Sequence, residues 1–130
     1  NYENFKNSFE HNFISLVKEY PNIDFIFFYP PYSILNYKLW QKYGVLKDIL
    51  KFKEYAFFRF LEFQNVKVYD FHNAFEVNSN LDNYKDLTHY HQNINSWIID
   101  QIKEDNYLLN KENIKKVNKQ LLVEINKGEL

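Results

Sequence analysis

The stretch NIDFIFFYPP, residues 22–31, decides how the rest of the sequence is interpreted. Its centre, Ile23–Tyr29, is almost wholly apolar and rich in strand-forming residues, and Pro30 and Pro31 close it. A short run of this kind is typical of a strand that is buried on both faces, as in a parallel sheet. We therefore predict a buried strand over Ile23–Tyr29 and an α/β class of fold.

Helical patterns precede and follow this strand in the sequence. Apolar residues recur at helical spacing over Tyr2–Glu19, and Pro21 ends the run. A longer helical pattern begins after Ser33, and Gly44 predicts a break in it near residues 43–45. The predicted order is helix 2–19, strand 23–29, two helices within 34–63, strand 66–70, polar loop 72–85, helix 91–104 and helix 111–126.

The alternation of strands and helices indicates a right-handed crossover and a parallel sheet. Two strands, however, do not make a sheet that helices can cover on both faces. Either strands have been missed, or the chain is the C-terminal portion of a larger domain, or a partner chain supplies the missing strands. Because both strands have the character of central rather than edge strands, we expect residues 1–130 to be one domain that forms the C-terminal portion of a larger one.

Composition narrows the functions that the chain can have. Apolar residues make up 45% of it and aromatic residues 20%, which is typical of a folded domain. The formal net charge of −1, with both signs interspersed, argues against nucleic acid as a partner. With no cysteine and only two glycines, thiolate metal sites and a glycine-rich phosphate loop are excluded, and we predict no cofactor. The longest apolar stretch is too short to span a bilayer.

The residues with the clearest chemical potential are Asp86 and His89, in the stretch DNYKDLTHYHQNIN. An Asp-x-x-His spacing on a turn lets the carboxylate accept a hydrogen bond from one imidazole nitrogen and fix the tautomer. The other nitrogen is then free to act as a general base toward a hydroxyl nucleophile near neutral pH. The alternative is structural: Asp86 caps a turn, and the His89 ring packs against Tyr90 or Trp97.

Other candidate residues have structural explanations of their own. Ser33 follows a strand as a nucleophile would, but we expect it to cap the next helix, and with Tyr32 to line a substrate cleft. The many aromatic residues could stack on bases or sugars, yet most fall on core-facing positions. A metal site could in principle take its ligands from five residues: His72, His89, His91, Asp70 and Asp86. The spacing of these residues does not suit a zinc site, and no metal is predicted.

From FIFFYPPYS to the Asp86–His89 loop, the chain resembles the C-terminal part of the SGNH (GDSL-like) hydrolase family, in its branch that acts on acyl groups of cell-surface polysaccharides. The resemblance implies a flavodoxin-like three-layer α/β/α fold with a parallel sheet. It also implies that Asp86 is the orienting acid and His89 the base of a Ser-His-Asp triad. An acyl-ester or carbohydrate substrate and a periplasmic or cell-envelope location are implied on the same basis.

The chain departs from this family in one important respect. No Gly-Asp-Ser block is present, and Gly44 and Gly128 are both in the wrong context to form an oxyanion hole. We therefore expect an esterase or O-acyltransferase whose nucleophile lies outside these 130 residues, so that this segment alone is inactive. The alternative is a non-catalytic α/β module that binds a protein or a glycan, and a weaker option is a helical assembly protein.

Overall fold

The computed structural model describes residues 1–127. The predicted first helix is present as one continuous helical segment that contains a π-helical turn in its middle. The elements are α1 (Tyr2–Phe9), η1 (Glu10–Ile14), α2 (Ser15–Glu19), β1 (Phe25–Tyr29), α3 (Ile34–Lys42), α4 (Leu46–Phe60), β2 (Val66–Asp70), η2 (Phe71–Asn73), α5 (Phe75–Asn78), η3 (Leu81–Asn83), α6 (Gln92–Lys103) and α7 (Ile114–Ile125).

The two predicted strands pair in parallel, in a register that runs from Phe25 opposite Val66 to Tyr29 opposite Asp70. The other edge of β2 is covered by an extended segment, because the Asp70 amide donates to Tyr107 O and the Leu109 amide donates to Val68 O, each over 2.9 Å. On β1, by contrast, no backbone hydrogen bond joins the edge away from β2 to any of the described residues. The sheet is therefore open along β1.

The two faces of β1 differ in burial, and the prediction of a strand buried on both faces is wrong. Phe25, Phe27 and Tyr29 pack against the core that α1, α4 and α7 build. On the opposite face, Ile26 is 53% exposed and Phe28 is 41% exposed. The physical reason is the position of α6, whose apolar side packs over the end of β2 and η2 rather than over β1.

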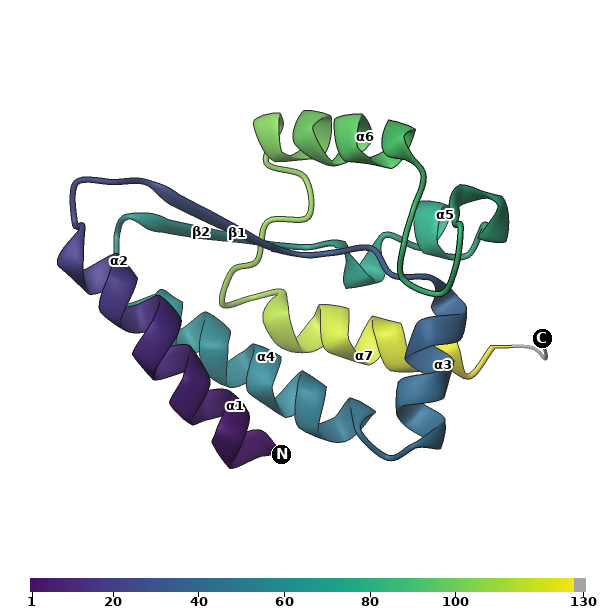
Figure 1. The fold of residues 1–130 in the computed structure, drawn as a ribbon, viewed down its shortest axis with the longest axis horizontal. Helices are drawn as coiled ribbons and strands as arrows, with labels where there is room; N and C mark the ends of the chain where they lie inside the picture. Colours follow the sequence, from purple (N-terminus) through teal and green to yellow (C-terminus); the bar gives the residue numbers. More distant parts are fainter. Residues whose placement is uncertain (128–130) are drawn as a thin grey trace.

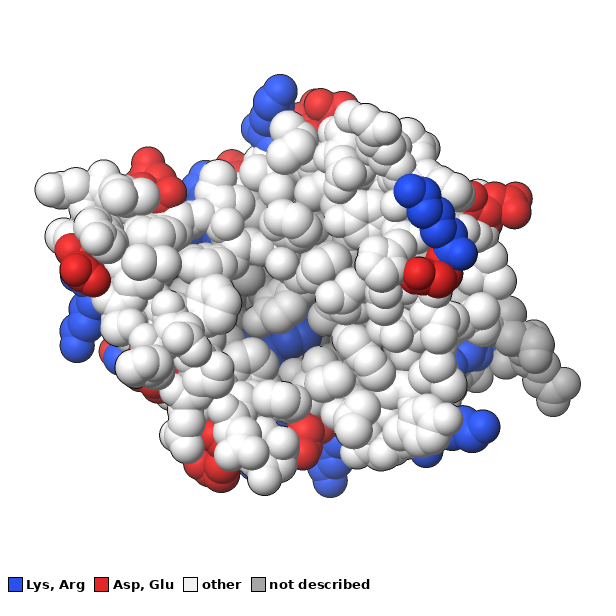
Figure 2. Space-filling model, in the orientation of Figure 1, with Lys and Arg blue, Asp and Glu red and all other residues white. Residues whose placement is uncertain are grey.

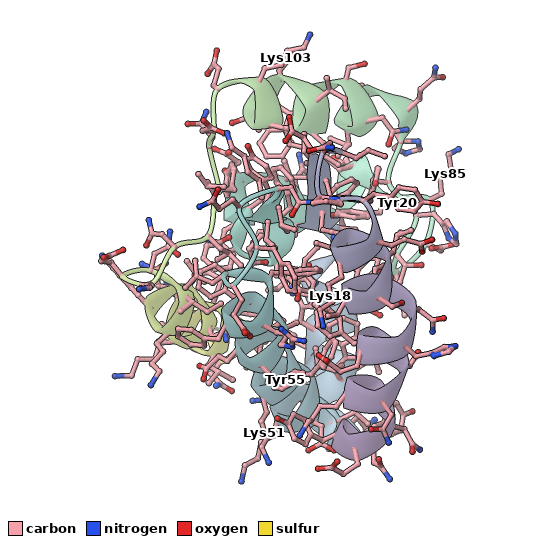
Figure 3. All side chains as sticks on the ribbon, turned by 90° about the vertical axis from the view of Figure 1, so that its left-hand side faces the viewer. Lys18, Tyr20, Lys51, Tyr55, Lys85 and Lys103 are labelled. Carbon is pink, nitrogen blue, oxygen red and sulfur yellow. The ribbon has the colours of Figure 1, made fainter. Side chains whose placement is uncertain are left out.

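Helices lie on both sides of the two strands, which confirms the α/β class (Figure 1). The helices α1, α4 and α7 lie below the strands in this view, and α6 lies above them. Seen from the side, Lys103 at the end of α6 and Lys51 on α4 mark opposite ends of the molecule, with the strands between (Figure 3). No helix in residues 1–127 combines the length and the apolar character needed to cross a membrane.

The break predicted near Gly44 is confirmed, since α3 ends at Lys42 and α4 begins at Leu46. Gly44 has a φ of +75°, a conformation that side chains with a Cβ rarely adopt. The predicted polar loop over residues 72–85, however, contains short helical turns. Two of these turns, η2 and η3, begin at a side chain that accepts a hydrogen bond from the amide two residues later. The Asp70 side chain accepts from the His72 amide, and the Asn80 side chain accepts from the Asp82 amide.

Candidate active site

Asp86 and His89 meet as the spacing predicts. The imidazole Nδ1 of His89 lies 2.8 Å from Asp86 Oδ2 and 2.9 Å from Asp86 Oδ1, so Nδ1–H donates to the carboxylate. The side chains of His89 and Asp86 are 75% and 58% exposed, so the alternative in which the His89 ring packs against an aromatic neighbour is wrong. The Asp86 carboxylate also caps its own turn, because it accepts from the Thr88 and His89 amides.

The loop that carries the two residues is closed by its own backbone. The Lys85 amide donates to His89 O over 2.7 Å, and the His91 amide donates to Asn83 O over 2.8 Å. A bridge between Tyr84 and Tyr90 lies between these bonds. The loop presents its tip to solvent, and the side chain of Lys85 points away from the body of the molecule (Figure 3).

Two long-range contacts attach this loop to the carboxyl end of β1. The Tyr84 hydroxyl donates to Pro31 O over 2.7 Å. Ser33 donates twice to Leu87 O, from its amide over 3.0 Å and from its hydroxyl over 2.7 Å. The Asp86–His89 pair therefore lies beyond the carboxyl end of a parallel strand, where open α/β sheets bind ligands.

Ser33 is at the N-cap position of α3, but its side chain makes no capping hydrogen bond there. The prediction that its side chain caps the helix is therefore wrong, because its hydroxyl donates a hydrogen bond to Leu87 O instead. Ser33 is fully buried and holds the loop from below. Tyr32, beside it, is half-buried and packs edge-to-face on Trp40 at 5.8 Å between ring centres. The substrate-binding role of Tyr32 and Ser33 stays a prediction.

Replacing Ser33 by Ala tests this attachment. The variant loses the hydroxyl bond to Leu87 O but keeps the amide bond, so we expect the free energy of unfolding to fall by about 1 kcal/mol. Amide hydrogen exchange over residues 84–90 should accelerate, because one of the two anchors of the loop is weakened. The matched control is Ser96→Ala at an exposed position of α6. An unchanged exchange rate in the loop would show that Ser33 does not hold it.

The pKa of Asp86 is lowered to about 2. The main cause is the hydrogen bond from the Thr88 amide to the carboxylate, followed by those from the His89 amide and the His89 imidazole. Each of these donors favours the charged form of the carboxyl group. Because the folded-state pKa lies below the ordinary value of 3.8, the charged Asp86 carboxylate stabilises the folded state at neutral pH. This contribution is lost as pH falls through about 2.

A carbon-detected NMR titration of the Asp86 carboxyl group should show this shift. We expect a midpoint at about pH 2 in the wild-type chain. In His89→Ala the midpoint should stay below the ordinary value of 3.8, since the two backbone donors remain. A midpoint at the ordinary value in the wild-type chain would contradict the hydrogen-bonded geometry of the loop.

The second ring nitrogen of His89, Nε2, is the atom that could accept a proton in catalysis. With Nδ1–H donating to Asp86, Nε2 carries the lone pair and can accept a proton. No hydroxyl of residues 1–127 is hydrogen-bonded to Nε2. The hydroxyl that does contact the ring, Thr88 Oγ1, lies 3.4 Å from Nδ1 instead. The described residues thus pair a carboxylate with an imidazole as the acid and base of a triad would be paired, and place no hydroxyl in hydrogen-bond contact with Nε2.

Sequence reasoning missed a second polar cluster, which is buried. Lys53 Nζ donates to Asp70 Oδ2 over 2.6 Å and lies 3.2 Å from His72 Nδ1. The Asp70 carboxylate also accepts from the His72 amide. All three residues are at most 3% exposed. Burial and the neighbouring Lys53 ammonium lower the pKa of His72 to about 3, so its ring is neutral at physiological pH.

A signal for this cluster was present in the sequence. Lys53 occurs at a core-facing position of α4, in register with Leu50, Phe57 and Phe60. A lysine on the apolar face of a helix needs a buried counter-ion, and Asp70 at the end of a buried strand is the natural partner. Nothing in residues 1–127 gathers three His, Asp or Glu side chains as metal ligands. Of the residues considered for a metal, Asp70 and His72 lie in the buried cluster, Asp86 and His89 pair on the exposed loop, and His91 belongs to neither group.

A comparison of the chain with protein-family models, curated proteins and solved structures found no match.

Proposed function

We propose that the chain is the C-terminal part of an SGNH-like serine esterase or O-acyltransferase with a flavodoxin-like three-layer fold. Asp86 and His89 would be two members of its triad, and a serine outside the 130 residues the third. The observation that carries the proposal is the hydrogen bond from His89 Nδ1 to the Asp86 carboxylate on an exposed loop. This bond leaves Nε2 free and directed away from its orienting acid.

In this proposal, His89 Nε2 takes the proton of the serine hydroxyl as the serine oxygen attacks the ester carbonyl. The Asp86 carboxylate stabilises the imidazolium that forms and holds its orientation. His89 then donates the proton to the leaving alkoxide as the ester bond breaks, and the acyl group remains on the serine. Water completes hydrolysis, or a second hydroxyl group accepts the acyl group in a transfer reaction.

The open edge of β1 supports the view that the sheet continues outside this chain. The amide and carbonyl groups of Ile26 and Phe28 have no backbone partner there among the described residues, and the side chains of both are exposed. A strand with an unpaired edge and an apolar exposed face is a site for pairing with another strand. We propose that the remaining part of the domain, or a partner chain, adds its strand at this edge.

The substrate class and the location rest on the resemblance to the family. We propose an acyl ester, in the first place an O-acetyl group on a cell-surface polysaccharide, and a periplasmic or cell-envelope location. The exposed position of His89 agrees with a bulky substrate, because a polymer can reach a loop at the surface.

The experiment compares two forms of the protein with 4-nitrophenyl acetate. The protein translated with its upstream reading frame should hydrolyse the ester, whereas residues 1–130 alone should not exceed the uncatalysed rate. Turnover by the 130-residue chain that disappears in Ser33→Ala would show that the nucleophile is Ser33, and that the proposed division of the triad is wrong.

The second candidate is a non-catalytic α/β module that binds a protein or a glycan. The observation in its favour is that no hydroxyl among residues 1–127 is hydrogen-bonded to His89 Nε2. The same experiment separates the two functions, because a binding module remains inactive toward the ester in both forms of the protein.

A further inference from the structure

A cavity of about 500 Å³ lies between the N-terminal helical segment, β1 and α4. Figure 2 shows a hollow in the middle of the face on which these elements lie. Its walls are mostly aromatic, and the lining residues include Phe9, Phe13, Phe27, Tyr32, Trp40 and His72. A basic side chain is visible at the floor of the hollow (Figure 2). Ligand sites in proteins typically have volumes of about 300–1,000 Å³ and mainly apolar walls of this kind.

The hydrogen bonds of the buried cluster define the tautomer of His72. The Lys53 ammonium group has only donors, so His72 Nδ1 must accept from it across their 3.2 Å separation. A second N–H of the ammonium group donates a hydrogen bond to Asp70 Oδ2, and the carboxylate compensates the ammonium charge. The neutral His72 ring therefore carries its proton on Nε2, on the edge that faces away from Lys53.

His72 Nε2–H has no hydrogen-bond acceptor among residues 1–127. The side-chain atoms that are both enclosed and unpaired belong to Asn36, Asn73 and Asn118, so Nε2 is not sealed inside the protein. His72 lines the cavity and is 3% exposed. A donor that opens only onto mostly apolar walls has few partners in the empty cavity, which favours a ligand that supplies an acceptor.

We propose that this cavity is a binding site for an uncharged, ring-sized apolar molecule whose carbonyl oxygen accepts a hydrogen bond from His72 Nε2–H. The rings of Tyr29, Tyr32, Tyr37 and Trp40 surround the imidazole, with centres 5.2–6.1 Å from its own. Of these rings, Tyr29, Tyr32 and Trp40 line the cavity and provide flat apolar surfaces for the body of the ligand. An anionic ligand is excluded because Asp70 already compensates the Lys53 charge, and apolar walls do not stabilise a second negative charge.

Two probes that differ only in the acceptor test the proposal. 2-Acetylnaphthalene carries a carbonyl group and naphthalene does not, and their binding to the 130-residue chain can be followed by ligand-observed NMR. We expect 2-acetylnaphthalene to bind roughly five- to tenfold more tightly, the ratio that one additional hydrogen bond provides. The nitrogen chemical shift of His72 Nε2 should change only with the carbonyl probe.

Two variants locate the site. In His72→Phe the ratio of the two affinities should fall to about one, and any loss of folded protein leaves this ratio unchanged because it lowers both affinities by the same factor. Ser8→Trp places an indole at the exposed rim of the cavity and should weaken both probes. Its matched control is Glu3→Trp, on the same helix but outside the cavity, which should bind both probes as the wild type does.

Three results would overturn the proposal. The first is equal affinity of the wild-type chain for the two probes. The second is a ratio that His72→Phe leaves unchanged. The third is no binding of either probe, as expected if the cavity only receives apolar side chains from a strand added to β1.

Discussion

Replacing His89 by Ala should lower kcat/KM for 4-nitrophenyl acetate by about 10⁴- to 10⁶-fold in the protein that includes its nucleophile, the range of effects typical of a serine triad. In the proposed mechanism Nε2 accepts the proton of the serine hydroxyl, and among the described residues no other imidazole is hydrogen-bonded to Asp86. The fold should be unaffected, because the side chain is 75% exposed and its only side-chain partners among residues 1–127 are Asp86 and Thr88. The thermal midpoint should therefore match that of the wild type.

His91→Ala is the matched control for this variant. His91 lies two residues further along the chain, is also exposed, and has no side-chain hydrogen bond to any other described residue. It should retain wild-type activity. Asp86→Asn should also reduce kcat strongly, since an amide does not stabilise the imidazolium. Near wild-type activity in His89→Ala would remove His89 from the mechanism altogether.

Replacing Asp70 by Asn should lower the free energy of unfolding by about 3–5 kcal/mol, because it leaves the Lys53 charge buried without a counter-ion. The two side chains are each 1% exposed, so solvent cannot compensate the loss. A loss of this size is a large part of the total stability of a small domain, which is about 5–15 kcal/mol. Urea unfolding followed by circular dichroism measures it.

The pH dependence of this variant has a definite sign. Burial lowers the pKa of Lys53, and Asp70 opposes that shift in the wild-type chain. In Asp70→Asn the opposition is gone, so the folded-state pKa falls further below the unfolded value of 10.5. The unfolded chain then binds more protons than the folded one, and the stability of the variant should rise as pH increases toward that value.

A double variant and a surface pair serve as controls. Lys53→Met with Asp70→Leu removes both charges and should cost less than Asp70→Asn alone, since no buried charge is left unpaired. Glu124→Gln breaks the partly exposed ion pair with Lys127 and should change stability by less than about 1 kcal/mol. Equal losses in Asp70→Asn and Glu124→Gln would show that the buried pair does not contribute as described.

The sequence predicted the elements whose patterns are local. The break at Gly44, both strands and the helices follow from proline, glycine and apolar spacing, which act over a few residues. The Asp86–His89 contact was also predictable, because three residues on a turn bring the two side chains together whatever surrounds them.

Long-range features were not predictable from the same patterns. Ile26 and Phe28 have the character of a fully buried strand, but their exposure depends on where α6 packs. The bond from Ser33 to Leu87 O joins segments 54 positions apart, and local rules assigned Ser33 to a helix cap instead. Lys53 on an apolar helix face was a usable signal for the buried cluster. That His72 is its third member depends on the fold and could not be read from local patterns.

The most direct test of the proposed triad is the labelling of the protein, with its upstream reading frame, by a fluorophosphonate, which reacts with a serine that a neighbouring base activates. We expect one serine outside residues 1–130 to be labelled, as located by peptide mass spectrometry, and the labelling to be lost in His89→Ala and retained in His91→Ala. Labelling that persists at the wild-type rate in His89→Ala, or no labelling of the wild-type protein, would contradict the assignment of His89 as a catalytic base.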